Sequence, residues 1–339
     1  MKSIVKKSLA LLLAGLILAG FAGCISPGAD KPGIEPEITS VPSEAPTEAS
    51  SGAPSEDYPL PENPDAVGDC VKDAEVLLHI PYGDEKEGVG LTGPDAERDW
   101  YNGPESFTVA DGKIYLLDTI KRRVIVSDGE TTDYIDISEP LAYWTQIAVI
   151  GDKLYLGDSS EEIPVLAVFD MTGNKLEDIE LPDRMMENGI SKLFTSNGHL
   201  AIYDNELVFY KMEDDGFSEV YDIGVDPVAE PKFTVTFGDN EIGLDTGDNT
   251  RPGVQMIRDD RIYLEVLGYD PDADTESIRE VSYRVYDFSG KLLGATAVDR
   301  RELFTLSGSK MYVSPEGELY VMCCMKDGVY VTKPHLRAE

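Results

Sequence analysis

Two short stretches of this 339-residue chain combine aromatic rings with amide and carboxylate groups, and both tryptophans lie in them. Their members are Trp100, Tyr101, Asn102 and Glu105 in the first stretch, and Tyr143, Trp144 and Gln146 in the second. Aromatic faces can stack on a sugar or a peptide while a few polar groups fix its orientation. We therefore predict that these seven residues bind a ligand. The competing interpretation is that the rings fill the space between neighbouring sheets.

Signals of catalysis or metal binding are few. The three histidines, His79, His199 and His335, share no metal-ligand spacing, and no nucleophile elbow, zinc-protease helix or phosphate loop occurs. One acidic run, residues 270–276, resembles a calcium loop because calcium prefers clustered carboxylates. It lacks a glycine at the sixth position, and Val281 stands where a bidentate glutamate is needed. We expect no catalytic residue and no cofactor, with Ca²⁺ at this run as a weak alternative to an acidic solvated insertion.

The expected elements are short strands that recur with the same turn. Five units combine a tight polar turn with an apolar strand, at residues 111–116, 151–156, 197–202, 259–264 and 316–321. Such recurrence is typical of repeat architectures. Four-stranded meanders are predicted at residues 105–137, 146–181, 191–223 and 254–298, followed by strands at 310–332. Residues 233–244 supply only a hairpin.

Several strands, such as residues 124–126 and 319–322, are apolar on both faces, which indicates sheets covered on both sides. Radially stacked blades meet that condition. We predict an all-β fold, a β-propeller of four-stranded antiparallel blades formed by residues 67–339. Blades of about 45 residues would make six, with five or seven left open by the weak hairpin. Residues 74–80 should complete the last blade as its outer strand, because an open ring would expose a long edge.

In a propeller, the connections into the innermost strands meet at one end of the ring, so the two aromatic stretches should converge there. Further polar residues at matching places are Thr145, Asn188, Ser191, Arg251 and Gln255.

Residues 104–119 and the following Arg123-Val124-Ile125-Val126 resemble NHL-type propeller repeats, and a second unit keeps the core Gly-Asp-Lys-Leu-Tyr-Leu-Gly-Asp. The resemblance implies the propeller superfamily that also holds gluconolactonase-type lactonases. Those enzymes are expected to hold a divalent cation at the channel mouth, where Asn102, Glu105 and Asn188 would be the contributors here. The resemblance to NHL-type repeats does not indicate which function of that superfamily this chain performs.

The first 23 residues form a predicted signal peptide, with Lys2, Lys6 and Lys7 ahead of an apolar run. The sequence Phe-Ala-Gly-Cys at residues 21–24 resembles the bacterial lipoprotein box, which implies cleavage before Cys24 and lipidation of its thiol. A diacylglyceryl group with palmitate-type chains would anchor the protein stably. An ordinary cleaved signal or an uncleaved anchor helix is the alternative. Residues 24–66, with nine prolines and many Ser and Glu, read as a disordered tether.

The charge balance of 29 basic against 64 acidic residues gives a net charge of −35. Such a field repels nucleic-acid phosphates, so we expect no nucleic-acid partner. Beyond Cys24, the chain has Cys70, Cys323 and Cys324, and an extracytoplasmic location permits a disulfide between Cys70 and either of the others. Unpaired buried thiols remain an equal alternative.

Together these features predict a protein anchored by lipid on the extracytoplasmic face of a bacterial cell membrane. Its propeller would bind a ligand or a protein partner, of unknown identity, without covalent chemistry. The alternatives are a divalent-metal-dependent lactonase-like hydrolase and a structural scaffold of the cell envelope.

Overall fold

The computed structural model describes residues 74–93, 101–139, 143–158, 164–214, 216–226, 232–269, 278–299, 303, 305 and 309–337. The predictions for the signal peptide, the tether, Cys24, Cys70, Trp100 and residues 270–276 lie outside these residues. Within the described residues, no helix has the length and apolar character needed to cross a membrane.

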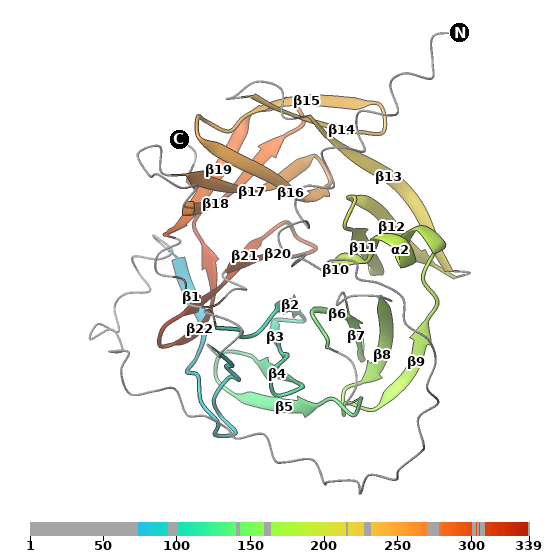
Figure 1. Cartoon of the computed structure of the whole chain (residues 1–339), viewed down its shortest axis with the longest axis vertical. Helices are drawn as coiled ribbons and strands as arrows, with labels where there is room; N and C mark the ends of the chain where they lie inside the picture. The colour runs from blue at the N-terminus through green and yellow to red at the C-terminus, as the bar shows by residue number, and fades with distance from the viewer. Residues whose placement is uncertain are drawn as a thin grey trace, which may run out of the picture. The chain divides into compact units, whose positions relative to one another are not determined.

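The described strands form five blades that follow one another around a ring (Figure 1). Blade 1 contains β2 (Ser106–Ala110), β3 (Lys113–Asp118), β4 (Arg123–Ser127) and β5 (Thr132–Asp136). Blade 2 contains β6 (Gln146–Ile150), β7 (Lys153–Asp158), β8 (Val165–Asp170) and β9 (Lys175–Ile179). After the short helix α2 (Asp183–Asn188), blade 3 contains β10 (Ile190–Ser196), β11 (His199–Asp204), β12 (Val208–Glu213) and β13 (Gly216–Asp226). The predicted all-β propeller of four-stranded antiparallel blades is confirmed.

Blade 4 contains β16 (Thr250–Arg258), β17 (Arg261–Tyr269), β18 (Ile278–Asp287) and β19 (Leu292–Asp299). Blade 5 takes three strands from the end of the chain and one from near its start, namely β20 (Ser309–Val313), β21 (Leu319–Met325), β22 (Gly328–Pro334) and β1 (Ala74–Ile80). β1 pairs with β22 from Ala74 opposite Pro334 to Ile80 opposite Val329. The predicted closure by residues 74–80 is therefore confirmed, and it joins the two ends of the ring.

The favoured count of six blades was wrong, because the described strands form five blades, one of the two alternatives left open. The hairpin of β14 (Lys232–Phe237) and β15 (Asn240–Asp245) continues the third sheet, because the last residues of β13 pair with β14. It also packs against blade 4, where the Tyr286 hydroxyl donates to the Asp245 carbonyl oxygen at 2.7 Å. The hairpin thus fills outer space beside blade 4 and adds no strand to the inner ring.

The outer turns of blades 2 and 4 each pack closely against the backbone of an outer strand of the preceding sheet. A Cβ at Gly173 would lie 1.9 Å from the Asp136 carbonyl oxygen of β5, and one at Gly290 would lie 2.5 Å from the Gly243 oxygen of β15. Both glycines have positive φ, at 83° and 81°. β15 therefore contacts the outer turn of blade 4 in the same way that β5 contacts the outer turn of blade 2. The hairpin of β14 and β15 thus occupies the place of the outer strands of a further blade.

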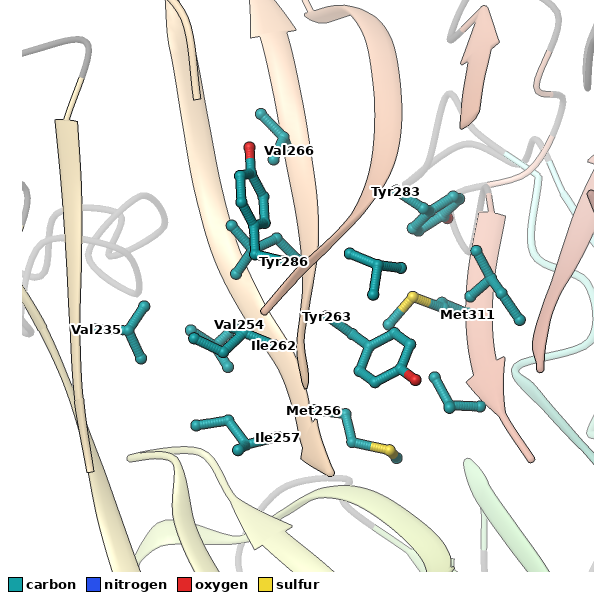
Figure 2. Close-up of a cluster of buried hydrophobic side chains, with 14 of the residues drawn as sticks. Val235, Val254, Met256, Ile257, Ile262, Tyr263, Val266, Tyr283, Tyr286 and Met311 are labelled. Carbon is teal, nitrogen blue, oxygen red and sulfur yellow. The ribbon is translucent and has the colours of Figure 1, made fainter. Parts of the chain in front are cut away.

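Strand residues alternate between the two faces of each blade, and both faces are buried. Ile114 and Leu116 of β3 pack against blade 5, whereas Tyr115 and Leu117 pack against blade 2. Figure 2 shows the same alternation in blade 4, where Val235 of β14 lies on the side of Ile262, and Met311 of β20 lies on the side of Tyr263 and Tyr283. Each fully buried Leu, Ile or Phe side chain contributes about 1.5–3 kcal/mol.

The repeated turn has the backbone conformation expected of a two-residue hairpin. Asp111 and Gly112 have φ values of 50° and 72°, and Asn197 and Gly198 have 50° and 77°. Two consecutive positive φ angles define the turns whose twist matches that of the flanking strands. These turns join the first two strands of blades 1 and 3.

Candidate functional site

The five innermost strands, β2, β6, β10, β16 and β20, begin at one end of the ring, here called the upper end. They finish at the repeated tight turns, which form the lower end. β20, β2, β6 and β10 pack side by side in that order. The upper end is where the sequence predicts the ligand-binding residues.

Trp144 lies inside the protein rather than on this end. Its side chain is 3% exposed and packs edge-on against Phe169, with ring centroids 5.6 Å apart. The Thr119 hydroxyl donates to its carbonyl oxygen at 2.9 Å, which ties blade 1 to blade 2. The Trp144 ring therefore fills the space between two blades, and it offers little surface to a ligand. Tyr143 beside it is 42% exposed, and its backbone N–H donates to Asp158 Oδ2.

The first stretch is held by backbone pairing. Asn102 exchanges two hydrogen bonds with Thr92, at 2.8 and 3.0 Å, and its side chain is 9% exposed. Tyr101 forms a parallel bridge with Thr305. Glu105 and Gln146 are half-buried at the starts of the adjacent strands β2 and β6. The structure thus brings Glu105 and Gln146 to the inner ring, while Trp100 lies outside the described residues.

Carboxylates at the upper end organise loops. Asp118, Asp158 and Asp204 end the second strand of blades 1, 2 and 3. Asp118 accepts hydrogen bonds from the Gly90 N–H and from Arg123 Nε, the latter at 3.0 Å. Burial raises the pKa of the Asp118 carboxyl, against the lowering effect of Arg123.

Asp204 accepts hydrogen bonds from the Glu206 and Val208 N–H groups and from Asn188 Nδ2 at 3.1 Å. Asn188, a contributor in the lactonase-like alternative, is thus engaged by a structural carboxylate. Across the described ranges, no group of three or more His, Cys, Asp or Glu is arranged to hold a metal ion.

The inner strands share a pattern that the sequence interpretation missed. Each carries or is directly preceded by a half-buried polar residue, and the next residue along the chain that belongs to the core is apolar. The polar residues are Glu105 and Ser106 in blade 1, Gln146 in blade 2, Lys192 in blade 3, Gln255 in blade 4 and Lys310 in blade 5. We call these six residues the axial cluster. The apolar residues below them include Phe107, Ile147, Leu193, Met256 and Met311, all buried.

Lys192 is the member of the axial cluster whose pKa departs clearly from its ordinary value. Burial lowers the pKa of its ammonium group to about 8, and the charges of Lys310 and Arg258 act in the same direction, against that of Glu265. Groups from blades 3, 4 and 5 therefore meet near this lysine. Lys192 nevertheless keeps part of its surface accessible.

Arg258 ties three blades together at the lower end of β16. Its guanidinium donates to the carbonyl oxygens of Val313 and Ser314 in blade 5 and of Thr195 in blade 3. Carbonyl groups are neutral, so these bonds leave the positive charge in place. The Arg258 guanidinium thus joins blades 3, 4 and 5 at the lower end of the ring, and the axial cluster lies nearer the upper end.

The charges of Glu105 and Lys310 reach the same buried thiol in blade 5. Both act on the buried Cys324, whose thiol pKa is raised to about 11 chiefly by burial. Cys323 and Cys324 lie in β21, and the predicted bridge to Cys70 stays a prediction. A signal for the axial cluster was present in the sequence, since a lysine within a buried strand is unusual and needs a reason.

Comparisons with known proteins add little beyond the fold. No protein-family model matches the chain, and no curated protein matches it in sequence. Among solved structures, a member of the DUF4221 family from Bacteroides vulgatus is 9% identical with a TM-score of 0.43, over 79% of this chain and 99% of that one. Streptogramin B lyase is 10% identical with a TM-score of 0.40, over 70% and 83%. YCF48 bound to D1 peptide is 10% identical with a TM-score of 0.39, over 76% and 98%. Similarities of this size assign no function.

Proposed function

We propose that this chain is a lipid-anchored protein of the extracytoplasmic face that binds a ligand at the upper end of its propeller. The axial cluster is the observation that supports the proposal. Each of the five inner strands contributes a half-buried polar side chain next to a buried apolar residue. Burying polar groups is unfavourable unless they gain partners, and a ring of such groups around one axis suits a small ligand.

A screen of the purified full-length chain in detergent tests the binding. The probes are neutral oligosaccharides, sugar acids, peptidoglycan fragments and short peptides, and the readout is the melting temperature followed by calorimetric titration. We expect at least one probe to bind, and the double variant Gln146→Ala/Gln255→Ala to bind it at least 10-fold more weakly. Lys113→Ala, an exposed change at the lower end of β3, is the matched control. No response to any probe would overturn the proposal.

The anchor is tested separately by Cys24→Ser. We expect the variant to leave the membrane fraction and appear in the soluble fraction, because it lacks the thiol that carries the acyl chains. Retention of the variant in membranes would contradict lipidation at this residue.

The burial of Trp144 favours a second candidate, a structural scaffold. An aromatic ring used for packing between blades contributes to rigidity and not to ligand contact. A scaffold would leave the melting temperature unchanged with every probe while still being released by Cys24→Ser.

A further inference from the structure

We propose that the outer edge of β9 is a docking site for a basic, extended segment of a partner protein, which would join blade 2 as a fifth strand. The strand lies on the outer rim of the ring (Figure 1) and not at the upper end. The inference therefore goes beyond the proposed function and does not depend on it.

In this ring, the outer turn of a blade generally covers the outer edge of the sheet before it. The turn of blade 2 lies just after β5, where the Ser138 N–H donates to the Gly173 carbonyl oxygen at 3.0 Å. The turn of blade 4 packs against β15 at Gly290. The turn of blade 1 approaches β1, since a Cβ at Gly129 would lie 3.8 Å from the Leu77 carbonyl oxygen. A covered edge is protected from pairing with another chain.

The edge of β19 in blade 4 is covered by the C-terminal residues instead of a turn. Ala295 and Arg337 exchange two backbone hydrogen bonds, at 2.9 and 3.1 Å. Leu336 lies beside them, because a Cβ at Gly294 would be 2.7 Å from its Cβ. Four of the five sheets thus have a neighbour on the outer edge.

The edge of β9 lacks such a neighbour among the described residues. Two residues separate β12 from β13, which begins at Gly216, whereas four residues separate β8 from β9. The outer turn of blade 3 is therefore shorter than that of blade 2. A Cβ at Gly216 would have no described atom within 4 Å, in contrast to the close contact of Gly173 with β5.

The backbone of β9 is consequently available for pairing. In the described part of the chain, β9 pairs with β8 alone, and alternate residues of an edge strand direct their N–H and C=O groups away from the sheet. The Lys175 N–H donates to Ser138 Oγ at 3.4 Å, so blade 1 holds the start of the strand. From Leu176 to Ile179, no described group outside β8 forms a hydrogen bond with the backbone. An extended segment can bind such an edge through main-chain hydrogen bonds.

The side chains of the strand indicate the chemistry of the partner. Leu176 is 51% exposed and offers an apolar contact. Glu177, Asp178 and Glu180 are exposed. Asp178 is paired with Lys175 at 2.7 Å, whereas Glu177 and Glu180 form no ion pair within the described residues. Opposite charges on adjacent strands stabilise the pairing, so the edge suits a segment that combines Lys or Arg with apolar residues.

A second copy of the chain fits this edge less well. Two β9 strands paired with each other would bring their carboxylates together, and like charges on adjacent strands are unfavourable. The net charge of −35 adds repulsion at long range. Residues 24–66 carry nine acidic side chains against one lysine, so this part of the chain is no better suited. The favoured occupant is a basic segment of another protein.

Calorimetric titration of the purified full-length chain, at about 0.15 M salt to screen long-range attraction, tests the inference. The probe is a blocked peptide in which lysine and valine alternate over about eight residues, enough to span the strand. One control peptide has every backbone amide N-methylated, and the other has glutamate in place of lysine. We expect the basic peptide to bind at least 10-fold more tightly than either control, and to slow amide hydrogen exchange at residues 176–179.

Two charge reversals locate the binding. Glu177→Lys should weaken binding of the basic peptide at least 10-fold. Asp133→Lys is the matched control, because it makes the same charge change at an exposed position of the covered strand β5, and it should alter the affinity by about 2-fold or less. The double variant Gln146→Ala/Gln255→Ala should bind the peptide as the wild type does.

Several results would overturn the inference. These are no binding of the basic peptide, equal binding of the N-methylated peptide, equal effects of the two charge reversals, or no slowing of exchange at residues 176–179. Dimers of the chain that dissociate in Glu177→Lys would assign the edge to a second copy instead. Loss of the peptide in the double variant would place it at the upper end and refute docking on β9. A failed ligand screen at the upper end would contradict the proposed function alone.

Discussion

Replacing Lys192 by Met should make the unliganded protein more stable at neutral pH. Burial and neighbouring charges lower the pKa of this lysine from 10.5 to about 8. One pKa unit corresponds to about 1.4 kcal/mol, so the folded state carries a penalty of about 3 kcal/mol for holding the charged form. Methionine has a similar length and no charge, and the partial exposure of the site reduces the expected gain to about 2 kcal/mol.

The pH dependence of this gain has a definite sign. The folded state binds the proton less tightly than the unfolded state, so the full penalty is present below pH 8. The stability of the wild-type protein should rise, relative to the variant, as pH increases from 8 to 10.5. The advantage of Lys192→Met should therefore shrink to about half at pH 9.5.

Equilibrium unfolding in urea at pH 7 and pH 9.5, without ligand, measures both quantities. Lys113→Met is the control, because Lys113 is exposed and surface changes alter stability by about 0.5 kcal/mol or less. A Lys192→Met variant as stable as the wild type, or less stable, at pH 7 would refute the reasoning. Its ammonium group would then have to be solvated or paired in the folded state.

Two further predictions concern the scaffold, and both are measured by urea unfolding. Gly173→Ala should destabilise by more than about 2 kcal/mol, since its Cβ would collide with the Asp136 carbonyl oxygen in addition to the strain of positive φ. Gly112→Ala, with a φ of 72° and open space around it, should cost only about 1 kcal/mol, and equal effects would contradict the docking of the outer turn. Leu116→Ala, fully buried between blades 5 and 1, should cost about 2–5 kcal/mol. Leu176→Ala, 51% exposed in β9, should change stability by about 0.5 kcal/mol or less, and a reversed order would refute the burial of both blade faces.

The meander predicted at residues 105–137 matches blade 1, which runs from Ser106 to Asp136, within one residue at each end. The reason is local, because the Asp111-Gly112 turn requires two positive φ angles and the residues around it are apolar on both faces. The role of residues 74–80 was also predictable, since a strand without a hairpin partner has to pair with the far end of a closed ring.

The number of blades depended on longer-range contacts. Residues 233–244 form the predicted hairpin, yet its place follows from the docking of β15 against the outer turn at Gly290. The prediction of six blades came from the chain length, so the residues of this hairpin and of the long strands of blade 4 were counted as a further blade. Whether a strand lies in the inner ring or outside it depends on contacts with other blades, and the local sequence does not indicate these contacts.

Sequence alone determined the repeat, the antiparallel blades and the closing strand, because turn chemistry and apolar alternation act between near neighbours. Tertiary structure decided the site. Trp144 has the composition of a binding residue, but the contact between blades 1 and 2 buries it. Lys192 and Lys310 lie far apart in the chain, in strands that carry no recognisable functional motif. Ring closure places both on inner strands, so that the charge of Lys310 helps to lower the pKa of Lys192, an effect that neither strand shows by itself.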